Sequence, residues 1–95
     1  MARKLAFTRS ARKAIVDLEP KFFKQVVSKI ISLTLDPAPQ DSLKLSGAEG
    51  LYRVNQGEFR IVYRYDEETV NIAVVGKRND DEVYRDTRHR QRESG

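Results

Sequence analysis

The chain has 95 residues, 34% of them charged, and a formal net charge of +4. This length supports one small hydrophobic core, so we expect a single domain over residues 1–95 with residues 91–95 frayed. The absence of cysteine excludes disulfides and thiolate metal sites, and a single histidine argues against a histidine-based zinc site. No apolar run is long enough for a membrane span or a signal peptide, which predicts a cytoplasmic protein.

The N-terminal part has the pattern of a short strand followed by two helices. Residues 3–7 alternate as a strand, and Thr8 is placed to cap a helix. Apolar residues then recur three and four positions apart, in two runs separated by Pro20 and ended by Pro37. This spacing predicts two antiparallel helices whose apolar stripes need a cover.

Residues 50–77 alternate between apolar and polar side chains, which is typical of β-strands. A turn at Gln56-Gly57 and a loop over Asp66–Thr69 would divide this segment into three antiparallel strands. Both registers, chosen separately, place the same apolar side chains on one face, which supports the meander. The predicted inward-facing set is Tyr52, Val54, Phe59, Ile61, Tyr63, Val70, Ile72 and Val74.

Asn79 and Glu82 have the spacing of a capping box, which predicts a final short helix. The predicted fold class is therefore α+β, with the element order β-α-α-β-β-β-α. Its small, mostly antiparallel sheet would bury the apolar face under the helical hairpin.

The opposite face of the predicted sheet carries arginines. The predicted register places Arg53 directly across from Arg60, a like-charge pair that costs stability. An anion held between the two guanidinium groups would remove this cost, and guanidinium suits phosphate. A solvated basic face with Glu58 or Glu67 as a partner explains the pattern equally well.

Familiar catalytic patterns are missing from the sequence. There is no GxSxG motif and no phosphate-binding glycine loop, and a single histidine excludes a catalytic histidine pair. The acidic clusters at residues 66–68 and 80–82 fit a turn and a helix N-terminus better than a metal site. What remains is a set of Arg, Lys and Tyr side chains, which can bind phosphate and stabilise an anionic transition state.

Four segments together resemble the RelE/ParE toxin superfamily, over essentially the whole chain. They are KLSG (44–47), LYRV (51–54), GEFRIVYRY (57–65) and VVGKRNDDEVY (74–84). RelE toxins are ribosome-dependent endoribonucleases that cut mRNA in the decoding site, and an antitoxin neutralises them. ParE toxins share the fold but poison DNA gyrase.

The resemblance implies three catalytic residues: Arg60, Arg78 and Tyr84. The residues that it implies for substrate binding are Lys44, Arg53, Asn55, Arg64, Lys77 and Arg85. Arg53 and Asn55 occupy positions where RelE toxins have lysines, and neither accepts a proton usefully, so Lys44 or Lys77 is the candidate base. Strict strand alternation would place Lys77 beside Arg60, whereas a bulge at Gly76 would favour Arg78 there.

The resemblance further implies the toxin of a type II toxin–antitoxin system that inhibits translation. The reaction would be attack of an RNA 2′-OH on the adjacent phosphate, without metal or cofactor. The expected partners are a RelB-like antitoxin, the ribosome and mRNA, and the free toxin would be a monomer that does not contact membranes. Two alternatives stay open: a ParE-type gyrase inhibitor and a catalytically inactive member of the superfamily.

Overall fold

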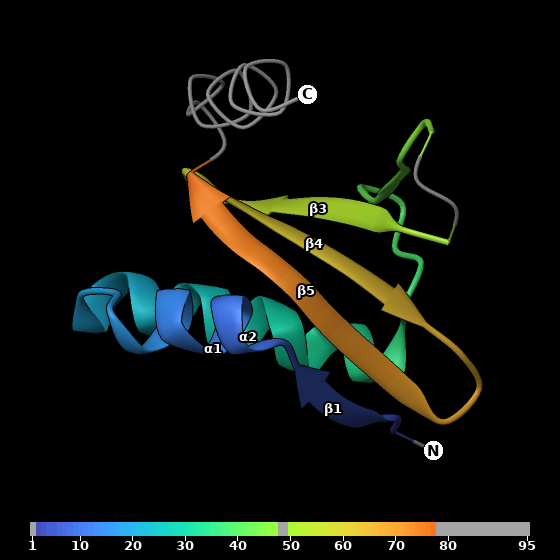
Figure 1. Ribbon diagram of the computed structural model, residues 1–95, viewed down its shortest axis with the longest axis horizontal. Coiled ribbons are helices and arrows are strands. Elements are labelled where there is room, and N and C mark those ends of the chain that lie inside the picture. Colours follow the sequence, from blue (N-terminus) through green and yellow to red (C-terminus); the bar gives the residue numbers. More distant parts are fainter. Residues whose placement is uncertain (1, 48–49, 78–95) are drawn as a thin grey trace, which may run out of the picture.

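The computed structural model describes residues 2–47 and 50–77, in which two helices pack on a five-stranded mixed sheet (Figure 1). The elements are β1 (Lys4–Phe7), α1 (Arg9–Val16), α2 (Pro20–Leu35), β2 (Leu43–Lys44), β3 (Tyr52–Gln56), β4 (Phe59–Tyr65) and β5 (Thr69–Lys77). The strand order is β1-β5-β4-β3-β2, with β1 parallel to β5 and the other neighbours antiparallel. This arrangement confirms the predicted α+β class. The predicted final helix lies outside the described residues.

Local sequence signals set the ends of both helices. The Thr8 side chain accepts a hydrogen bond from the Ala11 amide at 3.1 Å and so caps α1. Pro20 occupies the first turn of α2, where its missing N–H costs nothing. Neither helix in the described part of the chain is long and apolar enough to cross a membrane.

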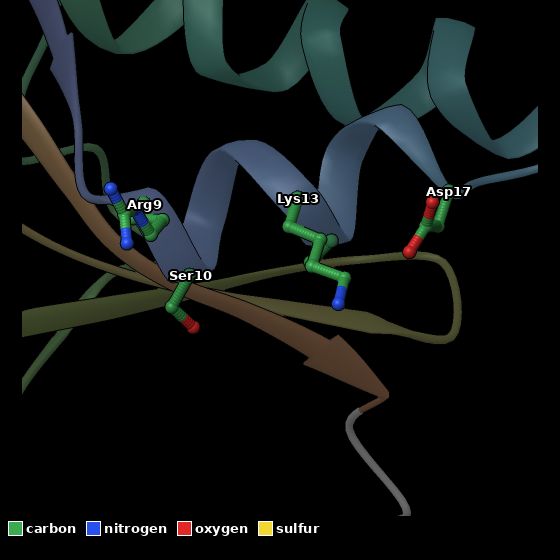
Figure 2. A pocket seen from close by; sticks show the side chains of 5 residues that line it. Arg9, Ser10, Lys13 and Asp17 are labelled. Atoms are coloured by element: carbon green, nitrogen blue, oxygen red, sulfur yellow. The ribbon is translucent and has the colours of Figure 1, made fainter.

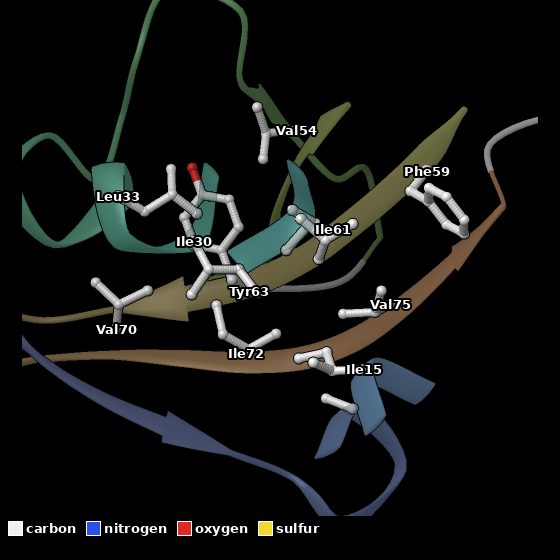
Figure 3. Packing of buried hydrophobic residues seen from close by; sticks show 12 residues of the cluster. Ile15, Ile30, Leu33, Val54, Phe59, Ile61, Tyr63, Val70, Ile72 and Val75 are labelled. Atoms are coloured by element: carbon white, nitrogen blue, oxygen red, sulfur yellow. The ribbon is translucent and has the colours of Figure 1, made fainter. Parts of the chain in front are cut away.

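The core lies between the helices and one face of the sheet (Figure 3). Ile15 of α1 and Ile30 and Leu33 of α2 pack over side chains from β3, β4 and β5. Ile61 and Tyr63 in the middle of β4 are both 0% exposed. The predicted inward face is therefore correct for β3, β4 and the first half of β5.

The hairpin between β3 and β4 differs from the prediction by two residues. Its turn is Gly57-Glu58, so that Arg53 lies across from Val62 and Asn55 across from Arg60. Gly57 has φ +58, which matches the first position of a two-residue hairpin turn of the II′ type. A shift of two residues leaves every side chain on its predicted face. The direct pairing of Arg53 with Arg60, however, was wrong.

The ladder between β4 and β5 contains a bulge at Ala73. Tyr63 pairs with Ile72 as predicted, but on the far side of the bulge Val62 pairs with Val74 and Ile61 with Val75. Val75 is therefore buried at 7% exposure, whereas Val74 is 43% exposed. The prediction that Val74 faces the core was wrong because one extra residue reverses the alternation beyond it.

Adjacent aspartate substitutions test the bulge. Val75→Asp should unfold the domain, because it places an unpaired charge in the core at a cost of more than about 3 kcal/mol. Val74→Asp carries the same loss of strand propensity but points outward, so its stability should fall by only about 1 kcal/mol. Urea unfolding of both variants measures the difference. The reverse order, with Val74→Asp the more destabilising of the two, would show that the register has no bulge.

Tyr63 is a buried tyrosine whose hydroxyl donates a hydrogen bond to the Pro37 carbonyl at 2.6 Å. Burial raises the pKa of Tyr63 from 10.0 to about 12, because the phenolate would lose its solvation. The bond ties the middle of β4 to the segment that follows α2.

Alkaline unfolding tests this burial. In the unfolded chain Tyr63 ionises near its ordinary pKa of 10.0, so its contribution to stability is complete below that pH and is lost as the pH rises toward about 12. Tyr63→Phe should lack this component of the pH dependence and should be less stable at neutral pH through loss of the hydrogen bond. Urea unfolding across this pH range compares the two proteins. Parallel pH profiles would mean that Tyr63 is not desolvated.

Candidate functional site

The side chains on the sheet face opposite α1 and α2 form what we call the arginine face. It comprises Arg53, Asn55, Arg60, Val62, Arg64, Asn71, Val74 and Gly76. Strand alternation forces these residues outward, because their neighbours in β3, β4 and β5 fill the core. Both described helices lie on the other side of the sheet (Figure 1).

Arg60 lies at the centre of this face, between Asn55 of β3 and Gly76 of β5. Its side chain is half-buried, and its Nε atom is buried. Arg53 is a diagonal neighbour of Arg60, at a Cα separation of roughly 7–8 Å for such positions, which long side chains can span. Both guanidinium groups can therefore reach one phosphate, although they do not face each other directly.

Gly76 leaves space beside Arg60. A Cβ added at Gly76 would meet no atom within 4 Å among the residues that the structure describes. Val62 follows Arg60 by two residues in β4 and lies on the same face, between Arg53 of β3 and Val74 of β5. Its side chain is 4% exposed. The site thus has a buried apolar floor beside a cationic group, with room on the β5 side.

Two asparagines add polar atoms to the arginine face. The Oδ1 atoms of Asn55 and Asn71 are buried, and neither has a hydrogen-bond partner in the described part of the chain. A buried amide oxygen without a partner costs stability, and an asparagine amide can both donate and accept. Asn55 lies next to Arg60, whereas Asn71 lies across from the exposed Arg64. The parity of Asn71 with Arg64 already placed it on this face in the sequence, but Asn71 was not among the predicted site residues.

The two candidate lysines do not join Arg60. Lys44 lies on β2 across from Tyr52, and Lys77 lies at the end of β5 across from Phe59. Directly opposed residues point to the same side of a sheet, so both lysines lie on the helix side. Strict alternation, which would place Lys77 beside Arg60, does not hold, because a bulge reverses the parity; this bulge lies at Ala73 and not at Gly76 as expected.

Three predicted site residues, Arg78, Tyr84 and Arg85, lie outside the described residues. In residues 2–47 and 50–77 no cluster of acidic, histidine or cysteine side chains could hold a metal ion. Figure 2 shows a shallow hollow elsewhere, on α1, whose lining is Arg9, Ser10, Lys13, Ala14 and Asp17. It contains none of the predicted site residues.

Comparisons with known proteins agree on a toxin fold. The family model described as the ParE toxin of the type II toxin–antitoxin system parDE matches residues 5–82. No curated protein matches the chain by sequence.

Solved structures of RelE toxins are similar to the chain. The isolated E. coli RelE toxin is 28% identical, with a TM-score of 0.72, over 94% of this chain and 98% of that protein. The RelBE2 toxin–antitoxin complex of Mycobacterium tuberculosis is 28% identical, with a TM-score of 0.70, over 82% of this chain and 100% of its own. The intact E. coli RelBE toxin–antitoxin complex is 27% identical, with a TM-score of 0.69, over 80% and 96%.

Proposed function

The chain belongs to the ParE toxin family of type II toxin–antitoxin systems, within the RelE/ParE superfamily, and we propose that it is a ribosome-dependent mRNA endoribonuclease. The observation that carries this proposal is the position of Arg60. It is half-buried at the centre of the arginine face, with Arg53 as a diagonal neighbour and open space at Gly76. A partly desolvated guanidinium group with space beside it can stabilise negative charge that develops on a phosphate, which supports the proposed nuclease activity.

The proposed reaction cleaves RNA by internal displacement. The 2′-oxygen attacks the adjacent phosphorus, the bond from phosphorus to the 5′-oxygen breaks, and the products are a 2′,3′-cyclic phosphate and a 5′-hydroxyl. Negative charge grows on the phosphoryl oxygens in the transition state, where Arg60 would stabilise it. Arg53 would hold the ground-state phosphate, and Asn55 would donate its amide N–H to a substrate oxygen.

Two further roles come from the resemblance alone. Arg78 would face the leaving 5′-oxygen, and Tyr84 would orient or stack a base. Arg64 and Arg85 would contact ribosomal RNA through its backbone charge.

Proton removal from the 2′-OH is the step for which the described residues of the arginine face offer no strong base. A guanidinium group, as in Arg53, and an amide, as in Asn55, are poor proton acceptors, while Lys44 and Lys77 lie on the helix side. The chain alone would therefore cleave naked RNA slowly. Ribosome binding would provide the alignment of 2′-oxygen and phosphate that the enzyme does not enforce by itself.

A RelB-like antitoxin is the proposed partner of this chain. The similar toxins of Mycobacterium tuberculosis and E. coli were solved as toxin–antitoxin complexes. The chain's net charge of +4 favours an acidic partner that covers the arginine face.

Gyrase inhibition is the alternative function, and the match to the ParE family model is the observation that favours it. The same basic surface could then serve protein binding without any chemistry at Arg60. The two functions differ in the nucleic acid that is broken in cells, which gives a direct test.

Brief expression of the chain in bacteria, followed by primer extension on mRNA, tests the proposed function. We expect cuts inside translated codons, and co-expression of an RelB-like antitoxin should suppress them. Arg60→Ala expressed to the same level is the control that should leave mRNA intact. Intact mRNA with gyrase-linked DNA breaks from the unsubstituted chain would instead establish the alternative.

Arginine substitutions separate catalysis from binding. Arg60→Ala should lower the single-turnover cleavage rate on programmed ribosomes by on the order of a hundredfold, with little change in apparent affinity. Arg53→Ala should mainly weaken apparent affinity and be partly rescued at saturating ribosome. Arg12→Ala, an exposed site on α1, controls for the loss of one positive charge. Thermal melts check that each variant is folded, and equal affinity losses for Arg53→Ala and Arg60→Ala would remove Arg60 from the catalytic residues.

A further inference from the structure

The apolar pattern of β5 allows two registers against β4. In the observed bulged register Val75 faces the core and Val74 faces outward. Without the bulge, continuation of the Tyr63–Ile72 pairing would bring Ile61 across from Val74 and turn Val75 outward. Both registers bury a valine next to Ile61, so burial of that side chain does not distinguish them.

The choice of register decides what lies beside Arg60. In the bulged register Gly76 is across from Arg60, and no atom of the described residues lies within 4 Å of where its Cβ would be. In the straight register Val75 would occupy that position, and Gly76 would face Phe59 on the core side. A branched side chain would then fill the space beside the guanidinium group.

Thr8 is in contact with the bulge itself. Its hydroxyl donates a hydrogen bond to the Ala73 carbonyl at 2.7 Å, and its backbone amide donates to the Ile72 carbonyl at 3.0 Å. The same hydroxyl oxygen accepts from the Ala11 amide to cap α1. The pairing of β1 with β5 ends at Ile72, one residue before the bulge. The next residue, Ala73, is the extra residue of the bulge, and its carbonyl accepts the hydrogen bond from the Thr8 hydroxyl.

We propose that Thr8 is a positioning residue: its hydroxyl selects the bulged register of β5 and thereby keeps Gly76, instead of Val75, beside Arg60. The register claim stands on the hydrogen bonds and the strand pairing. Its consequence for catalysis rests on the proposed nuclease function. Thr8 itself touches no substrate in this scheme.

Substitutions at Thr8 can separate the bulge contact from the helix cap. Thr8→Ser keeps both the donor and the acceptor, whereas Thr8→Asp keeps the cap but cannot donate to the Ala73 carbonyl. Nuclear Overhauser contacts between β4 and β5 report the register: Ile61 to Val75 when bulged, Ile61 to Val74 when straight. We expect only the first contact in the unsubstituted chain and in Thr8→Ser, and the second to appear in Thr8→Asp. An unchanged contact pattern in Thr8→Asp would overturn the proposal.

A second substitution provides a rescue. Val74→Thr is tolerated where residue 74 faces outward, but the straight register would bury its hydroxyl next to Ile61. Thr8→Asp/Val74→Thr should therefore regain the bulged contacts. A residue that acts only as a helix cap would give no such rescue, and that outcome would overturn the proposal.

Cleavage kinetics test the consequence for Arg60. Thr8→Asp should lower kcat by on the order of tenfold or more with KM for programmed ribosomes unchanged, and Val74→Thr should restore kcat in that background. If Thr8→Asp lowers kcat and Val74→Thr does not restore it in the double variant, Thr8 does not act by positioning. If the unsubstituted chain does not cleave mRNA, the nuclease proposal fails, while the magnetic resonance contacts still decide whether Thr8 selects the register.

Discussion

The burial of one face of β4 under α2 is the constraint on which the rest of the structure depends. Ile61 and Tyr63 are both 0% exposed, and successive strand residues point to opposite sides. Once these two side chains are buried, Arg60 and Arg64 must point away from the helices. The apolar core and the cationic surface are thus two results of the same alternation, and neither can move without the other.

The strands on either side of β4 complete the surface by different means. The β3 hairpin adds Arg53 and Asn55 through a turn that needs the positive φ of Gly57. On the other side, the bulge in β5 brings a glycine next to Arg60. Bulges commonly re-aim side chains at the edges of functional sites, and this one determines whether the centre of the arginine face is open or filled.

Membership of the RelE/ParE superfamily and the geometry of the sheet bear on different questions. The family establishes that the chain is a type II toxin. The distinction between nuclease and gyrase inhibitor lies in the site, because one fold can carry unrelated activities. The proposed phosphate chemistry rests on the half-buried Arg60 beside Gly76, and its proposed dependence on the ribosome rests on the finding that no base lies beside Arg60 among the described residues.

Local sequence was sufficient to determine the described elements other than β2, which was not predicted, and most of the faces. The alternation along β3 and β4, joined by a hairpin, determined that Arg53, Arg60 and Arg64 share a surface. The two-residue error in the hairpin register left that conclusion unchanged, since an even shift preserves parity. Proline and Thr8 marked the ends of the helices for reasons that act within a few residues.

Tertiary contacts decided what alternation could not. A run such as Ala73-Val74-Val75 has the same apolar character in either register, so its pattern cannot reveal a bulge that forms where β1 ends and α1 begins. The parity of Lys77 and the outward position of Val74 followed from that bulge. The side on which Lys44 lies likewise follows from the pairing of β2 with β3. The two-residue strand β2 is too short to show a periodicity of its own. The residues on the arginine face were thus set by local alternation, whereas the space beside Arg60 depends on long-range pairing.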